Sequence, residues 1–199
     1  MELFLIRHGQ SEADLLKVHE GRADFPLTME GVMQAQAMSL WMAETYLPDR
    51  IYASTLKRAA QTAEILGKAC GLTPLYDAEL MERDNGLLAG LDFTVAKERY
   101  PQVDHLPIHR ALHNAEPALD FRCRAERVLS KILEESNSIK RVAIVSHGRM
   151  INQLFHCLLQ LPINCSTSFM TGDTGIHCFR IREDGITLLF SNRTEHMQK

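Results

Sequence analysis

Two histidines follow short apolar runs at distant points of the chain. Arg7-His8-Gly9 comes directly after Leu3 to Ile6, and Ser146-His147-Gly148 comes directly after Val142 to Val145. Uninterrupted apolar runs of this length are typical of strands buried on both faces of a parallel sheet. Because ligands bind at the carboxyl ends of such strands, we expect both imidazoles to lie at one ligand-binding edge.

Two arginines accompany the histidines. Arg7 precedes His8, and Arg58 lies in the first turn of a helix expected at residues 56–68. A cation is unfavourable there, because the helix macrodipole already places positive charge at the N-terminus. A bound anion would remove this penalty; the alternative is that Arg58 is solvated or paired with an acid elsewhere. Guanidinium groups hold phosphate oxygens at any working pH, so this set of residues predicts a phosphate pocket.

The same residues predict how a phosphoryl group would be transferred. An imidazole attacks phosphorus only when it is neutral, and the flanking cations disfavour its protonated form. We therefore assign His8 as the nucleophile and His147 as the group that stabilises the transferring charge. Other phosphatase chemistries lack their motifs, because the sequence has no C-x5-R thiol site, no D-x-D-x-[TV] aspartyl site and no P-loop.

Alternating strand and helix patterns must position these groups. Strands are expected at residues 3–6, 50–54, 74–77, 141–146, 176–181 and 186–190, and helices at 28–46, 56–68, 94–99, 119–136 and 150–161. This order predicts an α/β fold, a three-layer sandwich with a mostly parallel central sheet, in one domain over residues 1–199. We expect residues 85–117 to form a lid insertion over the strand ends. Its histidines, His105, His109 and His113, are expected to be ordinary surface residues.

Composition limits the partners. The 199 residues carry a formal net charge of −3 and no long Lys/Arg run, so we expect no nucleic-acid partner. No apolar run is long enough to span a membrane or to form a signal peptide ahead of Arg7, so we expect no membrane partner and a cytoplasmic location. Five scattered cysteines without a C-x-x-C pair are expected to be reduced core thiols. Oligomeric state leaves no signal in the sequence.

These motifs resemble those of the histidine phosphatase superfamily, in its phosphoglycerate mutase-like phosphatase branch. Arg7-His8-Gly9 is similar to the phosphohistidine motif of that family, and Leu27-Thr28 with Gly31 is similar to its L-T-x-x-G motif. Residues 54–63 resemble S-x-L-x-R-A-x-Q-T-A, and Ser146-His147-Gly148 resembles the second histidine motif. The resemblance covers nearly the whole chain and implies a phosphoglycerate mutase-like fold.

The resemblance also implies roles for further residues. Leu80, Glu82 and Gly86 match an L-x-E-x-x-x-G context, in which Glu82 would be the general acid for the leaving alcohol. That role requires burial or the substrate to raise the pKa of Glu82. The family needs no metal, and we expect no cofactor. The expected substrate contacts are Arg7, Ser11, Asp14, Gly21, Arg58 and Gly148.

Asp14 is the departure from the family pattern with the most physical consequence. Asn is usual at this position, whereas Gln10 and Ser11 replace the frequent Glu and Thr. A carboxylate beside a phosphate site is repelled by the ligand, so an ionised Asp14 should turn away or pair with an arginine. Alternatively, Asp14 caps a short helix that begins near Leu15. The sequence leaves both alternatives open.

Three functions are compatible with these residues. We favour a phosphomonoester hydrolase that forms a phosphohistidine on His8, uses Glu82 as its acid and acts on a small phosphorylated substrate. A phosphoglycerate mutase is the alternative, although the interval from Glu82 to His147 is short for the insertion that shields a mutase phosphoenzyme from water. A non-catalytic phospho-ligand binding module is a third class, but both nucleophile and acid are present. The sequence does not identify the physiological substrate.

Overall fold

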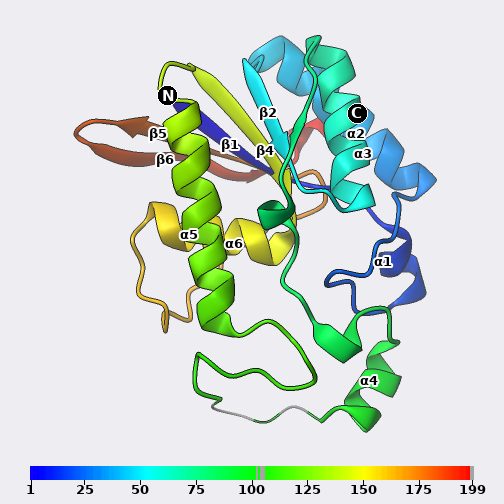
Figure 1. The fold of residues 1–199 in the computed structure, drawn as a ribbon. Coiled ribbons are helices and arrows are strands. Elements are labelled where there is room, and N and C mark those ends of the chain that lie inside the picture. The colour runs from blue at the N-terminus through cyan, green and yellow to red at the C-terminus, as the bar shows by residue number, and fades with distance from the viewer. Residues whose placement is uncertain (102, 104–105, 198–199) are drawn as a thin grey trace.

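The computed structural model describes the whole chain except residues 102, 104–105 and 198–199 (Figure 1). Its centre is a six-stranded sheet with the strand order β3-β2-β4-β1-β5-β6. The strands are β1 (Glu2–Arg7), β2 (Arg50–Ala53), β3 (Leu75–Tyr76), β4 (Arg141–Ser146), β5 (Ile176–Arg182) and β6 (Gly185–Arg193). The first four in chain order run parallel, and β5 is antiparallel to both β1 and β6. The prediction of a mostly parallel sheet is confirmed.

Helices cover both faces of this sheet (Figure 1). They are α1 (Glu12–Leu16), α2 (Met29–Thr45), α3 (Lys57–Cys70), α4 (Phe93–Arg99), α5 (Ala118–Glu135) and α6 (Gly148–Leu158). In β1, Leu3 and Leu5 pack with α5 and α6, whereas Phe4 and Ile6 pack with α2 and α3. Successive side chains of a strand point to opposite faces, so an apolar run is needed where both faces are covered. The three-layer α/β sandwich is therefore confirmed.

Two glycines allow the turn after β1 to pack closely against the start of α2. A Cβ on Gly9 would lie 2.4 Å from the Gly31 carbonyl oxygen, and a Cβ on Gly31 would lie 2.0 Å from the Gln10 carbonyl oxygen. The Thr28 hydroxyl accepts from the Gly31 N–H at 2.9 Å, so Thr28 caps α2 as predicted. This contact fixes the turn that carries His8 against the helix layer.

Two helices differ from the sequence-based expectation. The short helix α1 was raised only as an alternative, and it is stabilised by Ser11 as its N-cap. Helix α6 ends at Leu158, although the pattern predicted a helix as far as Leu161. The reason is that Gln160 adopts a left-handed conformation with φ of 53°, so the chain leaves the helix before it reaches Pro162.

The segment predicted as a lid lies beyond the carboxyl ends of the parallel strands, as the green segment around α4 in Figure 1. The His19 N–H donates to the Leu91 carbonyl at 2.9 Å, which ties this insertion to the loop after α1. His109 is exposed and His113 is half-buried, while His105 lies outside the described residues.

The cysteines form no disulfide. All five are free thiols, as predicted, but only Cys157 and Cys178 are buried, whereas Cys123 is exposed. Among the described residues, no helix is both long enough and apolar enough to cross a membrane.

Candidate active site

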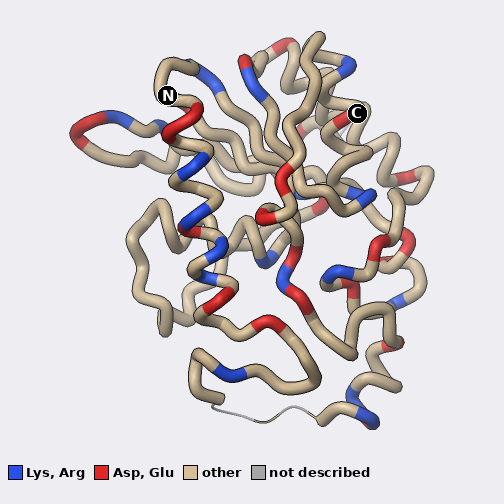
Figure 2. The backbone as a smooth tube through the Cα atoms, viewed as in Figure 1, with Lys and Arg blue, Asp and Glu red and all other residues tan. Residues whose placement is uncertain are grey.

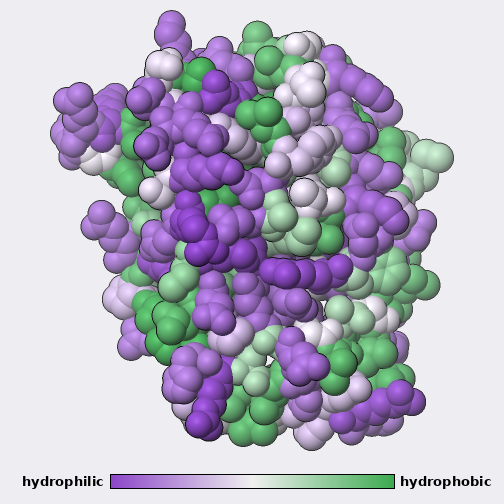
Figure 3. Space-filling view, viewed as in Figure 1, coloured by the Kyte–Doolittle hydropathy of each residue, from purple (hydrophilic) through white to green (hydrophobic). Residues whose placement is uncertain are grey.

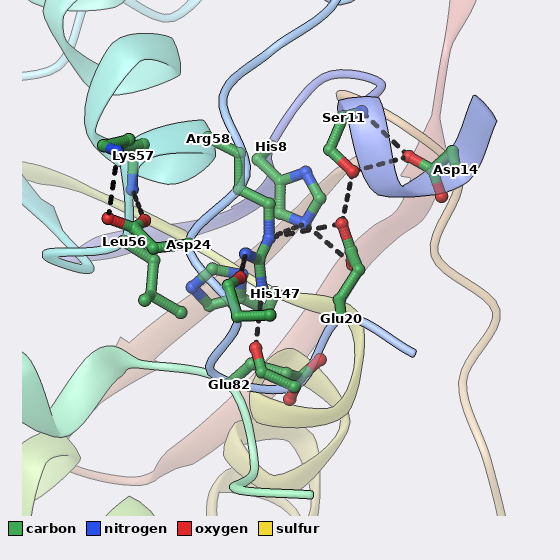
Figure 4. A network of polar contacts seen from close by, with 12 residues as sticks. His8, Ser11, Asp14, Glu20, Asp24, Leu56, Lys57, Arg58, Glu82 and His147 are labelled. Carbon is green, nitrogen blue, oxygen red and sulfur yellow. Dashed lines mark hydrogen bonds and ion pairs between the residues drawn. The ribbon is translucent and has the colours of Figure 1, made fainter. Parts of the chain in front are cut away.

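The two predicted histidines lie side by side at the carboxyl ends of β1 and β4. The strand register pairs Arg7 with Ser146, and the His8 N–H donates to the Ser146 carbonyl at 3.1 Å. The ring centroids of His8 and His147 are 5.1 Å apart, with an interplanar angle of 59°. Both side chains are buried. The structure therefore brings together the imidazoles that the sequence assigned to one sheet edge (Figure 4).

The hydrogen bonds of His8 indicate which ring nitrogen carries the proton. Its Nδ1 lies 2.7 Å from the Gly9 carbonyl oxygen, which can only accept, so we assign the proton to Nδ1. Its Nε2 accepts from Arg58 Nε at 3.2 Å and therefore bears a lone pair. Burial, followed by the charges of Arg58 and Arg7, holds the pKa of His8 well below 6.5. A neutral imidazole of this form can act as a nucleophile.

One ring nitrogen of His147 has no hydrogen-bond partner among the residues that the structure describes. Burial, followed by the charge of Arg58, holds the pKa of His147 well below 6.5. Its Nε2 lies 2.8 Å from the Ser54 hydroxyl, while its buried Nδ1 has no partner among the described residues. His147 occupies the N-cap position of α6, and Gly148 leaves open space where a side chain would lie. An oxyanion bound at this helix start would fill the space and satisfy the free nitrogen.

Arg58 is fully buried, and its guanidinium is held from several sides. Besides the bond to His8, its Nη1 donates to the Ala23 carbonyl and its Nη2 donates to the Gly21 carbonyl, each at 2.9 Å. Gly21 has φ of +50°, and a Cβ there would lie 2.9 Å from the Asn85 side chain, so a larger residue would be strained. Gly21, predicted as a substrate contact, holds Arg58 through its carbonyl oxygen.

Arg7 also has a side-chain nitrogen to which the described part of the chain offers no partner. Its Nη1 donates to the Thr171 carbonyl at 2.9 Å, and its Nη2 lies 3.3 Å from Asp173 Oδ1. Its buried Nε has no partner within the described part of the chain. Burial raises the pKa of Asp173, and the charge of Arg7 opposes that effect. The free nitrogens of Arg7 and His147 are two buried polar groups that a bound anion would satisfy.

Glu20 is a side chain of this site that the sequence analysis missed. One carboxylate oxygen lies 3.4 Å from Arg58 Nε, and the other lies 3.9 Å from His8 Nε2. The Ser11 hydroxyl donates to Glu20 as well (Figure 4). The position of Arg58 in the first turn of a helix indicated that an anion lies nearby, but the sequence did not indicate which residue supplies it. Glu20 is that acid in this structure.

Asp14 forms a reciprocal capping arrangement with Ser11. The Ser11 N–H and hydroxyl donate to Asp14 Oδ2 at 2.8 Å and 3.1 Å. Ser11 is the N-cap of α1 and Asp14 its third residue, so the two side chains form a capping box. The expectation that Asp14 caps a helix beginning near Leu15 is wrong in its position, because α1 begins at Glu12 and Asp14 is the third residue of its first turn; Asp14 instead supports the cap at Ser11. The Ser11 hydroxyl is shared between Asp14 and Glu20.

Glu82 lies just before the insertion, and both of its carboxyl oxygens accept hydrogen bonds from the backbone. The Arg83 N–H donates to Oε1 at 2.8 Å, and the Arg149 N–H donates to Oε2 at 3.1 Å. Burial raises the pKa of Glu82, and these backbone hydrogen bonds and the arginine charges reduce that effect without reversing it. The sequence interpretation required a raised pKa here, and the cause is burial.

Arg124 of α5 holds the segment that carries Glu82. Its guanidinium donates to the carbonyls of Glu79, Met81 and Glu82 at 2.6, 2.8 and 3.3 Å. It also forms a paired interaction with the Glu116 carboxylate, with both N···O distances at 2.8 Å. Because Arg124 is itself buried, this arrangement fixes the backbone on either side of the insertion.

Taken together, the site has the groups for phosphoryl chemistry. Arg7 and Arg58 are fixed cations, His8 has an unprotonated ring nitrogen beside Arg58, and burial raises the pKa of the Glu82 carboxyl group. Among the described residues, no group of three or more His, Cys, Asp or Glu side chains is arranged to hold a metal ion.

Comparison with known proteins places this chain in a family. The histidine phosphatase superfamily (branch 1) matches residues 3–194. A 2,3-bisphosphoglycerate-dependent phosphoglycerate mutase of Rhizobium etli is 30% identical over 192 residues, which cover 92% of this chain and 91% of that protein. The alpha-ribazole phosphatase of Shigella flexneri superposes with a TM-score of 0.86 at 25% identity, covering 98% of this chain and 97% of that one.

A mycobacterial glucosyl-3-phosphoglycerate phosphatase shares the fold, with a TM-score of 0.83 at 24% identity, covering 96% of this chain and 98% of that one. The predicted phosphoglycerate mutase-like fold is thereby confirmed. The family match extends from β1 through the last strand, so it includes both histidine motifs and Arg58. The chain therefore belongs to the histidine phosphatase superfamily, whose members are phosphatases or mutases.

Proposed function

We propose that this protein is a metal-independent phosphomonoester hydrolase that needs no cofactor and forms a phosphohistidine on His8. The observation that carries the proposal is the protonation state of the His8 ring. Its Nδ1 proton is directed to the Gly9 carbonyl, and its Nε2 lone pair lies beside Arg58. Burial and two arginines keep the ring neutral, so it is ready to attack phosphorus without first losing a proton.

The proposed reaction has two steps. In the first, His8 Nε2 forms a bond to phosphorus as the ester P–O bond breaks, and Glu82 gives its proton to the departing alkoxide. In the second, ionised Glu82 takes a proton from water as the water oxygen attacks phosphorus. The P–N bond then breaks, inorganic phosphate leaves and neutral His8 is restored. Arg7, Arg58 and His147 stabilise the phosphoryl oxygens in both steps.

A mutase is the second candidate, because a relative that is 30% identical carries the name of a phosphoglycerate mutase. The two functions share the phosphohistidine and differ in what accepts the phosphoryl group. We favour water as the acceptor because the interval between Glu82 and His147 is short for a mutase. Isomerisation of a phosphoglycerate, primed by a bisphosphoglycerate, at a rate above that of phosphate release would reverse this preference.

The test is rapid quench with a radiolabelled phosphomonoester. We expect an acid-labile, base-stable adduct in the wild-type protein and none in His8→Ala. The exposed His109 provides a matched control, because His109→Ala removes an imidazole outside the site. Phosphate release by His8→Ala at the wild-type rate would rule out the proposal.

A further inference from the structure

His177 is a fully buried histidine that the proposed reaction does not use. It belongs to β5, and the turn that joins β5 to β6 carries exposed charged residues at 182–184. These residues colour the tip of the hairpin in Figure 2 and make it a hydrophilic projection at the left of Figure 3. His177 lies at the opposite end of β5, where the strand register pairs it with Leu5, two residues before Arg7. It is therefore close to the strand end that carries the candidate site.

The hydrogen bonds of His177 indicate its tautomer. The Asn192 backbone N–H can only donate, and it lies 3.0 Å from Nδ1, so Nδ1 accepts and we assign the proton to Nε2. The Ser191 hydroxyl lies 3.0 Å from the same Nδ1. Nε2 lies 3.1 Å from the Thr171 hydroxyl and therefore donates to it. Burial lowers the pKa of His177 to about 4, so the ring keeps this neutral form at neutral pH.

The His177 ring holds the Thr171 side chain in one orientation. The Thr171 hydroxyl accepts from His177 and donates to the Phe169 carbonyl at 3.4 Å, so its hydrogen bonds run in one direction. The ring itself is fixed by Phe155, which packs edge-on against it with centroids 4.9 Å apart and an interplanar angle of 85°. Because both partners of the hydroxyl are buried or half-buried, the rotamer of Thr171 is set by its neighbours rather than by solvent.

The loop of residues 171–175, which His177 holds through Thr171, also holds Arg7. The Thr171 carbonyl accepts from Arg7 Nη1 at 2.9 Å, and Asp173 Oδ1 lies 3.3 Å from Nη2. The Gly175 carbonyl accepts from the Arg7 backbone N–H at 3.2 Å. These contacts use three donors of Arg7 and leave its buried Nε, which has no partner among the described residues. The loop therefore decides the direction in which Arg7 presents its remaining donor.

Asn192 of β6 holds the same loop at a second point. Its Oδ1 accepts from the Gly172 N–H at 2.8 Å, while its own N–H is the donor to His177. A Cβ on Gly175 would lie 2.4 Å from Asn192 Oδ1, so the absence of a side chain on Gly175 makes room for this contact. The hairpin thus binds two consecutive residues of the loop, and it does so through neutral groups.

We propose that His177 is a positioning residue for phosphate binding, which acts through Thr171 to orient the Arg7 guanidinium toward the phosphoryl group. This inference rests on the proposed function, in which Arg7 binds that group, and adds the residue that orients Arg7. Without the Nε2 proton of His177, the Thr171 hydroxyl loses a buried donor, and the carbonyl of the same residue is no longer fixed for Nη1. Contacts between a guanidinium and a phosphate depend on direction, so a small displacement weakens them.

The test measures the Kd of inorganic phosphate, by phosphorus NMR titration, for two variants that each keep one half of the imidazole. Gln places its amide near the position of Nε2 and can donate to Thr171, whereas Asn reaches only the position of Nδ1. His177→Asn should raise the Kd about tenfold, and His177→Gln should raise it by no more than about threefold. In an Arg7→Met background, His177→Asn should change the Kd by less than about twofold, because His177 acts through Arg7.

His156→Asn is the matched control. His156 is also buried, and its Nε2 lies 2.7 Å from the carbonyl of Thr167, outside the loop of residues 171–175. The substitution should lower Tm but leave the Kd of phosphate within about twofold of the wild-type value, which separates positioning from loss of stability. Thr171→Val keeps the test decisive even if His177→Asn fails to fold: it should raise the Kd about fivefold, and Thr171→Ser should not.

An unchanged Kd in His177→Asn or in Thr171→Val would overturn the inference. Equal losses from His177→Asn with and without Arg7 would also overturn it, because they would show that His177 acts on the whole fold. If the Kd changes are as expected but the wild-type protein forms no phosphohistidine, the proposed function fails while the positioning role of His177 stands.

Discussion

Replacement of Glu20 by Gln should strengthen the binding of inorganic phosphate. The Glu20 carboxylate lies 3.4 Å from Arg58 Nε and 3.9 Å from His8 Nε2. A phosphoryl group in position for attack must place phosphorus about 3 to 3.5 Å from His8 Nε2. Ligand and carboxylate therefore compete for the same cation and nearly the same space. Gln keeps the size and hydrogen-bonding capacity of the side chain and removes its charge.

The size of the effect follows from this separation. Unit charges about 5 Å apart repel by roughly 3 kcal/mol at an effective dielectric constant of about 20, and a phosphate dianion doubles this value. Most of that cost is avoided in the wild-type protein, because the Glu20 side chain is 18% exposed and can turn toward solvent. If about 1.4 kcal/mol remains, Glu20→Gln should lower the inhibition constant of phosphate about tenfold.

The assay is competitive inhibition of aryl phosphate hydrolysis by inorganic phosphate, supported by the phosphate-dependent shift in Tm. Glu12→Gln is the matched control, because Glu12 carries the same charge in α1 but is exposed. It should change the inhibition constant by less than twofold. An unchanged or higher inhibition constant in Glu20→Gln would refute the reasoning, since it would mean that Glu20 helps to bind the ligand.

Four further outcomes are expected. Glu82→Gln should reduce kcat/KM far more for alkyl phosphates than for p-nitrophenyl phosphate, whose leaving group needs no proton, and equal losses would contradict the acid role. Activity on alkyl phosphates should persist below pH 6.5, because the pKa of His8 is lowered and the ring stays neutral. The same activity should fall as the pH rises through the raised pKa of Glu82, because the acid loses its proton. A kcat/KM that falls below pH 6.5 and rises through the pKa of Glu82 would exclude His8 as the nucleophile and Glu82 as the acid. Burial lowers the pKa of His177 to about 4, so the unfolded chain binds a proton that the folded protein does not between pH 6.5 and 4. As the pH is lowered from 6.5 to 4, the free energy of unfolding should therefore fall by about 1.4 kcal/mol per pH unit because of this group. Urea unfolding of His177→Gln should show a smaller dependence of the free energy of unfolding on pH. Activity should also survive prolonged chelation, and a loss restored by Mg²⁺ or Zn²⁺ would disprove metal independence.

The sheet and the paired histidines could be predicted because their signals are local. The apolar runs before His8 and His147 reflect burial on both faces, and the carboxyl ends of parallel strands must share an edge. The place of Arg58 in the candidate site could also be predicted, because a cation in the first turn of a helix is unfavourable next to the positive end of the helix macrodipole. In each case a few adjacent residues carry the whole signal.

The remaining features depend on contacts between distant segments. Glu20 lies in an irregular loop, and only the fold brings it to Arg58. The end of α6 was misplaced because Gln160 adopts a left-handed conformation that its residue type does not announce. The contact of Arg124 with Glu116 and with the carbonyl groups before Glu82 joins three segments, so no single motif contains it.

The Arg124 contacts have a consequence for how such a protein can change over time. The Arg124 side chain binds the backbone at Glu82, just before the insertion begins, and also binds Glu116, where the insertion returns to α5. The two ends are therefore anchored independently of what lies between them. Substitutions among the intervening residues can therefore occur without displacing the two anchored ends of the segment. Arg124 thus allows the residues between Glu82 and Glu116 to vary while the backbone at both positions stays fixed.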